Sequence, residues 1–216
     1  MEFQDQEEKI QFFFDAPIRA PSEHSRDGFH SVLYLLRREL IETLGYDPDA
    51  NTEADVDRGG ARRRLFASLG LMFSGFDLLA KFALGDSGRV GTRFCKFMRC
   101  PEGGGLTSVD ARLLWAIRNS VVHAFGLPPR NALTAQGLAH VGLGTRKEET
   151  LRDSAGLVVV ERRPDLELAI VYIDGVFRTL ISATSRYHDA LYGSSAAPAR
   201  TRFNDAFDLY GLIRIV

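Results

Sequence analysis

Apolar residues recur every three or four positions in five stretches of the chain, the spacing that places them on one face of a helix. These stretches are residues 24–44, 61–84, 89–99, 109–125 and 175–192. The second stretch is the most apolar, and its small residues would let another helix approach closely. It is therefore expected at the centre of a helical bundle.

The pattern changes from helical to strand-like after the fourth helix. Residues 137–144, 157–162 and 166–173 are short and rich in Val, Ile and Leu, and Arg163-Pro164-Asp165 is a turn signal between the last two. A small antiparallel hairpin or three-stranded meander is therefore expected just before the last long helix.

The two ends of the chain lack a long periodic pattern. Residues 1–23 are predicted to form an irregular arm, in which residues 10–14 make a short strand or pack on the core. Residues 194–199 are typical of a linker. The last residues, 212–216, are apolar enough to add a strand to the sheet or to pack across a partner.

These elements predict a mainly α protein, an up-and-down bundle of four to five helices with a small antiparallel β insertion. A chain of 216 residues is long enough to bury a core of this kind as a single domain. The expected parts are an N-terminal arm (1–23), core helices (24–135), a β insertion (136–173), a C-terminal bundle helix (174–193) and a tail (194–216).

Composition adds few constraints to this picture. The formal net charge is −1, and 45% of the residues are hydrophobic and 25% charged, so no global attraction to nucleic acid or to a membrane surface is expected. Any site for a polyanion must be a local patch. The N-terminus is acidic where a secretory signal would be basic, and no apolar run approaches the ~18–20 residues of a membrane span. A cytoplasmic protein without membrane association is expected.

Two further motifs fail as functional sites. Cys95 and Cys100 have no nearby pair of histidines, so they do not form a zinc pattern and are expected to be a reduced pair. The run Gly103-Gly104-Gly105 has no Lys-Ser/Thr after it and does not follow a strand, so it is not a nucleotide phosphate loop. No metal or cofactor is expected.

Three polar residues, Arg118, Asn119 and His123, lie near the end of the fourth helix, which Gly126 and Pro128 then stop. Five residues at ~100° each separate the Arg and His side chains by roughly 140° on an ideal helix. Both can therefore face one phosphate only if the last turn unwinds or a second subunit completes the site. The plainer alternative is a helix-terminal cation beside a half-buried imidazole.

These residue types suit RNA cleavage without a metal. That reaction needs a base for the 2′-hydroxyl, an acid for the leaving 5′-oxygen and positive charge near the phosphorane. His123 can act as base or acid near neutral pH, Arg118 presents a planar fork to phosphate oxygens, and Asn119 could orient the imidazole or donate to phosphate. Two copies of His123 across a dimer cleft could divide the acid and base roles.

The segment Ile117-Arg118-Asn119-Ser120-Val121-Val122-His123, with the apolar helix around residues 75–81 before it, resembles the HEPN superfamily of prokaryotic helical-bundle proteins. Arg118 matches the arginine of that family's motif, Asn119 the adjacent polar position and His123 the histidine. The resemblance implies a bundle of four or five helices, usually a homodimer with both motifs in one cleft. Many members resemble metal-independent endoribonucleases of toxin–antitoxin or phage-defence systems.

Other candidate residues are local. Basic residues that could guide RNA are Arg62, Arg63, Arg93, Lys96 and Arg130, although such charges are usually solvated helix faces. Asp77 and Lys81 stand four apart and could pair, either as a solvated ion pair or near the site.

The sequence therefore predicts an RNA-cleaving homodimer, with an antitoxin protein as a further expected partner. The alternative is a catalytically inactive HEPN-like module that binds RNA or a protein partner.

Overall fold

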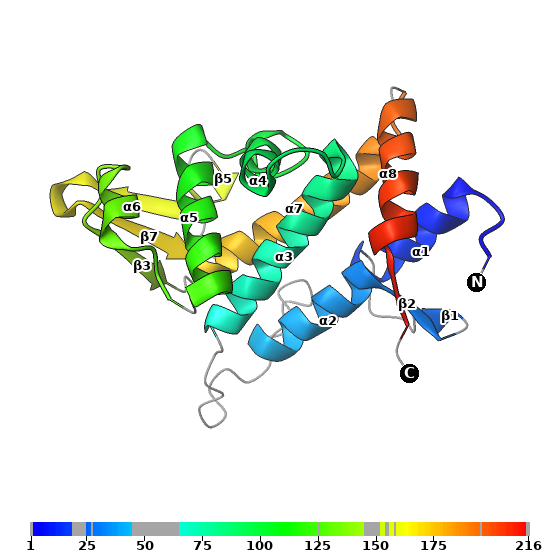
Figure 1. The fold of residues 1–216 in the computed structure, drawn as a ribbon, viewed down its shortest axis with the longest axis horizontal. Helices are drawn as coiled ribbons and strands as arrows, with labels where there is room; N and C mark the ends of the chain where they lie inside the picture. Colours follow the sequence, from blue (N-terminus) through cyan, green and yellow to red (C-terminus); the bar gives the residue numbers. More distant parts are fainter. Residues whose placement is uncertain are drawn as a thin grey trace.

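The computed structural model describes residues 2–18, 25–26, 28–44, 65–124, 126–144, 152–153, 156–157, 159–194 and 196–214. Within these residues the protein is mainly helical, as predicted, with small β-sheets (Figure 1). The helices are α1 (Gln6–Ile18), α2 (Val32–Leu44), α3 (Leu65–Leu84), α4 (Val90–Arg99), α5 (Ser108–Ala124), α6 (Arg130–Thr134), α7 (Ile173–Ala190) and α8 (Ala197–Tyr210). The strands are β1 (Ser25–Arg26), β2 (Phe29–Ser31), β3 (His140–Gly144), β4 (Arg152–Asp153), β5 (Gly156–Leu157), β6 (Val160–Arg163), β7 (Leu168–Tyr172) and β8 (Leu212–Arg214).

Helix α3 lies at the centre of the fold, as its apolar sequence predicts. It packs against α2, α4, α5, α7 and α8. Gly75 permits the closest approaches, since a Cβ there would lie 2.7 Å from a methyl of Leu36 on α2 and 2.9 Å from one of Leu180 on α7. A small residue is therefore required where these three helices meet.

The apolar stretch of α3 is longer than predicted from the sequence. Phe66–Leu84 is long and apolar enough to cross a membrane by length and composition, so the expectation that no stretch reaches this length is wrong. Half of its most apolar window is buried inside the protein, and a core helix meets the same criteria. Its contacts with five other helices account for this composition.

Helices α1 and α8, near the two ends of the chain, were not predicted from the sequence. In α1 the fully buried residues are Ile10, Phe13 and Phe14, and Phe13 stacks on Phe82 of α3 with ring centroids 4.6 Å apart. In α8, Phe203 and its neighbours on the same face are buried against this cluster. Residues 6–18 of the predicted irregular arm and residues 197–210 of the predicted tail are thus helical. A few aromatic residues at helical spacing bury enough area to hold each helix.

The strand regions also differ from the prediction. β6 and β7 form the expected antiparallel hairpin, and the turn between them is a short 3₁₀ helix (Pro164–Leu166). β3, however, pairs with β7 in parallel, so the sheet order is β3-β7-β6 and the region is not a meander. The strand predicted at the end of the chain is β8, but it pairs with β2 in a separate sheet. Figure 1 shows the two sheets at opposite ends of the molecule.

The beginning of α5 is fixed by side chains on both sides. The hydroxyl of Thr107 accepts a hydrogen bond from the Asp110 backbone N–H at 3.1 Å and donates one to the Asp110 carboxylate at 2.7 Å. Arg162 of β6 donates to the other oxygen of Asp110 at 3.0 Å. The sheet is thereby tied to the first turn of the helix that carries the Arg-Asn-x-x-x-His motif.

The turn between α4 and α5 contains the glycine run. Gly103 donates to the Cys100 carbonyl at 3.0 Å, and its own carbonyl accepts a hydrogen bond from Arg186 of α7. A Cβ on Gly103 would lie 2.7 Å from the carbonyl carbon of Phe97 and closer still to its oxygen. Glycine is therefore needed for close packing of the turn on the end of α4, a structural role.

Candidate functional site

The second half of α5 lies beside the first half of α3. A Cβ on Gly70 of α3 would be only 3.8 Å from a methyl of Val121, so the two helices approach closely at this level. Buried Leu113, Leu114, Ile117 and Val121 hold the apolar face of α5 in the core. The polar residues of the motif consequently lie at the edge of the core and on the solvent side.

Arg118 reaches from α5 to Asp77 on α3. Its Nε and Nη2 donate to the same carboxylate oxygen of Asp77, at 3.0 and 2.7 Å. The two side chains are only 16% and 14% exposed, so water screens this ion pair little. Asp77 thereby fixes the guanidinium and neutralises its charge within the protein.

The remaining guanidinium nitrogen, Nη1, is directed toward the other two motif residues. It donates to Asn119 Oδ1 at 3.3 Å and lies 3.4 Å from His123 Nε2. Arginine can only donate, so this contact is a hydrogen bond when His123 is neutral and carries its proton on Nδ1. Protonation of His123 would place two positive charges side by side, an arrangement that a bound anion would stabilise.

Arg118 and His123 come together without an unwound last turn and without a second subunit. They approach within one chain while α5 continues to Ala124. The angle between their Cα–Cβ bonds is large, but the arginine side chain is long enough to cover the distance along the helix. Dimerisation is therefore not needed to bring this Arg and this His together.

Trp115 packs against the guanidinium of Arg118, a role that was not predicted from the sequence. The central carbon of the Arg118 guanidinium lies 5.1 Å from the Trp115 ring. The indole in turn packs on Phe94 of α4, with ring centroids 5.5 Å apart, and over Gly91. A Cβ on Gly91 would lie 2.7 Å from the indole, so α4 can approach only because this residue is glycine. The available signal was an aromatic residue one turn before the motif arginine.

Lys81 and Arg93 do not join this site. Lys81 does not pair with Asp77, because Asp77 forms its ion pair with Arg118. The Lys81 ammonium instead lies 3.9 Å from the centre of the Tyr210 ring. Arg93 was expected to face outward, but it is buried and pairs with Asp86 at 2.9 Å. A hydrogen bond from Tyr210 is the main cause that lowers the pKa of Asp86, and the same bond raises the pKa of Tyr210. This network fixes the turn after α3 to the end of α8.

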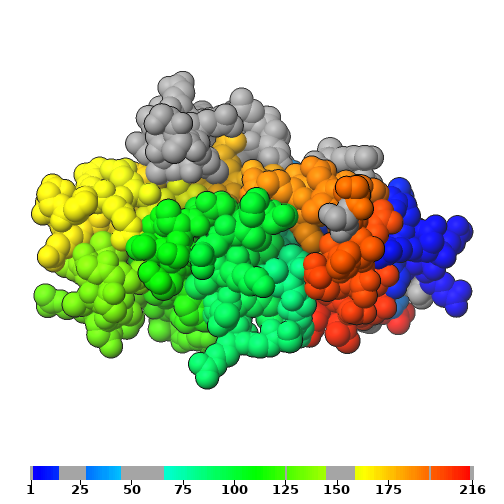
Figure 2. Space-filling view, turned by 90° about the horizontal axis from the view of Figure 1, so that it is seen from above, coloured from blue at the N-terminus to red at the C-terminus, as the bar shows by residue number. Residues whose placement is uncertain are grey.

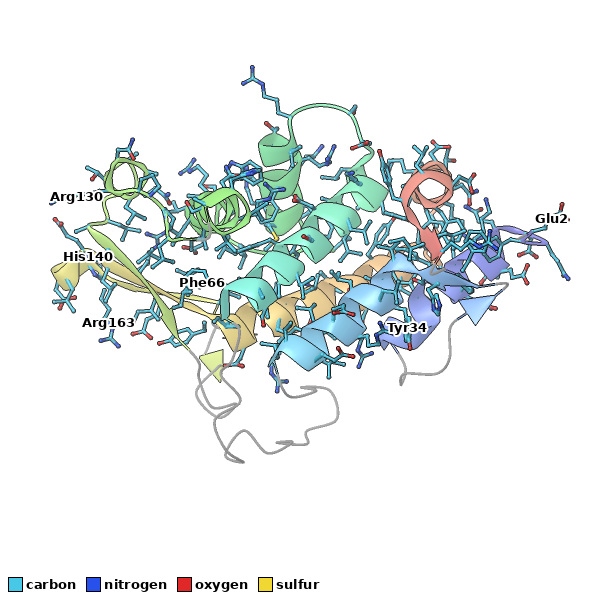
Figure 3. All side chains as sticks on the ribbon, turned by 60° about the horizontal axis from the view of Figure 1, so that its bottom comes forward. Glu2, Tyr34, Phe66, Arg130, His140 and Arg163 are labelled. Atoms are coloured by element: carbon cyan, nitrogen blue, oxygen red, sulfur yellow. The ribbon has the colours of Figure 1, made fainter. Side chains whose placement is uncertain are left out.

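The other basic candidates lie at different places. Lys96 is exposed on α4. Arg130 is exposed at the start of α6. Figure 3 shows it at the end of the molecule that contains the β3-β7-β6 sheet, near His140 and Arg163. Arg62 and Arg63 fall outside the described residues.

No group of three or more His, Cys, Asp or Glu side chains placed to hold a metal occurs among the described residues. Cys95 and Cys100 are free, and burial raises the pKa of both thiols. No protein-family model, curated protein or solved structure matches this chain.

Removing Asp77 should destabilise the protein by about 2 kcal/mol, because Arg118 would be left mostly buried without its counter-charge. A double-mutant cycle with Asp77→Ala and Arg118→Met, followed by urea unfolding, should give a coupling free energy of about 1–3 kcal/mol. The exposed pair Arg38 and Glu42 on α2 is a matched control, with expected coupling below about 0.5 kcal/mol. Equal coupling in the two cycles would contradict a structural role for the Asp77 contact.

Proposed function

We propose that this protein is a metal-independent endoribonuclease of the HEPN type, with the helical layout of that family. The observation that carries the proposal is the cluster of Asp77, Arg118, Asn119 and His123, in which a fixed guanidinium lies beside an exposed imidazole. A largely buried arginine beside an exposed histidine suits the binding and cleavage of a phosphodiester.

In the proposed mechanism, Nε2 of neutral His123 exchanges its contact with Arg118 Nη1 for the substrate and accepts the proton of the 2′-hydroxyl, whose oxygen attacks the neighbouring phosphorus. The phosphorus–5′-oxygen bond then breaks, the 5′-oxygen takes up a proton, and a 2′,3′-cyclic phosphate and a 5′-hydroxyl are released. In this step Nη1 of Arg118, which lies beside Asn119 and His123, and the amide nitrogen of Asn119 would donate to the phosphate oxygens. The described residues supply one imidazole to this cluster, so in this proposal the acid for the leaving oxygen comes from a second source.

A second copy of the chain would provide that acid, and exposed apolar residues support a dimer at this face. Val122 is 38% exposed and Leu127 is 40% exposed, on either side of His123 along the chain. Phe66, at the start of α3, is also 38% exposed (Figure 3). Exposed apolar residues close to a catalytic candidate in the chain, as Val122 and Leu127 are to His123, are found at surfaces that a partner covers.

One observation favours the alternative, a module that binds RNA or a protein partner such as an antitoxin without cleaving RNA. The charge of Arg118 is already neutralised by Asp77, which weakens its attraction for a phosphate. The two proposals differ in whether RNA products appear.

The test is incubation of labelled RNA with the purified protein in EDTA, alongside the Arg118→Ala and His123→Ala variants. Cleavage by the wild type only, giving cyclic phosphate and 5′-hydroxyl ends, is the expected result. Equal cleavage by all three proteins would sink the proposal, and RNA binding without cleavage would favour the alternative. Specific activity that rises with protein concentration would support the dimer.

A further inference from the structure

Three exposed cations gather where α4 lies beside the start of α5. They are Lys96 and Arg99 on α4 and Arg112 on α5, and none of the three has an ion pair or hydrogen bond to another described residue. This contrasts with Arg93, Arg118 and Arg162, each of which has a carboxylate partner. In a chain with a net charge of −1, an unpaired group of cations is a local feature.

Contacts with Cys95 indicate that Arg99 and Arg112 lie near each other, and Lys96 stands three positions before Arg99 on α4, on the same side of that helix. The Cys95 thiol is 3.7 Å from the Ala111 carbonyl, so this part of α4 contacts the residue just before Arg112. Burial raises the pKa of that thiol, and both Arg99 and Arg112 lie close enough to oppose the effect. Figure 2 shows that α4 and the start of α5 are uncovered on this face, between the β3-β7-β6 sheet and α8. The neighbouring acids are Asp110, held by Arg162, and Glu102 in the turn beyond Arg99.

One face of α5 connects this group of cations to the candidate site. Arg112, Ala116, Asn119 and His123 lie within about 60° of one another on an ideal helix and span about 16 Å. Arg112 and His123 are exposed, and Ala116 and Asn119 are partly exposed. At the 3.4 Å axial spacing of phosphates in one stacked strand, this length corresponds to about five phosphates.

We infer that a single strand of RNA binds along this face, with its phosphates on Lys96, Arg99 and Arg112 and its scissile phosphate at Arg118 and His123. We call the surface formed by Lys96, Arg99, Arg112, Ala116, Asn119 and His123 the α5 ridge. RNA fits it better than an acidic protein does, because exposed cations extend from the candidate site along α5 and onto α4, where successive phosphates of one strand can occupy them. The inference rests on the proposed function for the identity of the polyanion.

The test uses a fluorescent 12-nucleotide single-stranded RNA and fluorescence anisotropy, in a His123→Ala background that prevents cleavage. The ridge variant carries Lys96→Gln, Arg99→Gln and Arg112→Gln. The control variant carries Lys9→Gln, Arg38→Gln and Arg214→Gln, which changes the net charge equally on other elements. The ridge variant should bind at least about 10-fold more weakly. The slope of log K against log salt should fall in magnitude by about 2.

Equal binding by the ridge variant and the control variant, or no binding of RNA by their parent, would overturn the inference. Displacement of the RNA by polyglutamate of equal charge as efficiently as by unlabelled RNA would also overturn it, by indicating a site for acidic protein. If the wild type cleaves no RNA but the ridge variant loses binding, the proposed function fails and the inferred binding of RNA along the α5 ridge stands. If the wild type cleaves RNA but the ridge variant binds RNA as tightly as its parent, the proposed function stands and the inference fails.

Discussion

Replacing His123 by glutamine is expected to lower the rate constant of RNA cleavage by roughly 10²- to 10⁴-fold, the usual contribution of a general acid or base. Stability should not change, because the side chain is exposed and its contact in the described part of the chain is the 3.4 Å approach of Arg118 Nη1. The free energy of unfolding should remain within about 0.5 kcal/mol of the wild type. Single-turnover cleavage and urea unfolding measure the two quantities.

His140→Gln is the matched control, because His140 is also exposed but lies on β3 at the sheet end (Figure 3). It makes the same chemical change and should cleave RNA at the wild-type rate. An equal loss of activity in both variants would show that His123 has no special role. A fall in stability of more than about 1 kcal/mol in the His123 variant would indicate a structural role instead.

Replacing Gly103 by alanine should destabilise the protein by about 3 kcal/mol or more. The new Cβ would meet the backbone carbonyl of Phe97, which cannot move without unwinding the end of α4. The turn would shift, and with it the hydrogen bond from Arg186 and the start of α5. Urea unfolding measures the loss of stability directly.

Gly193→Ala is the control for this change. A Cβ at Gly193 would have the Ala190 carbonyl oxygen, at 3.7 Å, as its nearest neighbour. Stability should therefore stay the same or rise slightly, because alanine restricts the unfolded chain. A Gly103 variant as stable as this control would mean that the turn is less tightly packed than the structure shows.

The sequence predicts the long helices well, because α3, α4, α5 and α7 each carry a continuous apolar stripe that buries as one face. It does not predict α1 and α8, whose stripes are short and depend on aromatic contacts between residues far apart in the chain, such as Phe13 with Phe203. The parallel pairing of β3 with β7 also cannot be predicted from the local pattern of residues, since that pattern indicates each strand but not which strand lies beside it.

The candidate site was predictable in its residue types but not in its contacts. The i, i+4 spacing favoured a pair of Asp77 with Lys81, whereas the partner of Asp77 is Arg118, from another helix. Arg93 was predicted on the solvated face of its helix, but the nearby carboxylate of Asp86 makes its burial possible. Such ion pairs depend on how helices pack, which the spacing of charges along one helix does not determine.

Trp115 has a consequence for the study of this protein in solution. It is the single tryptophan of the chain, and its indole lies against the guanidinium of Arg118 and over Gly91. The intrinsic fluorescence of the folded protein therefore originates beside the candidate site. Its emission is a built-in optical probe of events at that guanidinium, from the arrival of an anion to the loss of Asp77, with no label attached.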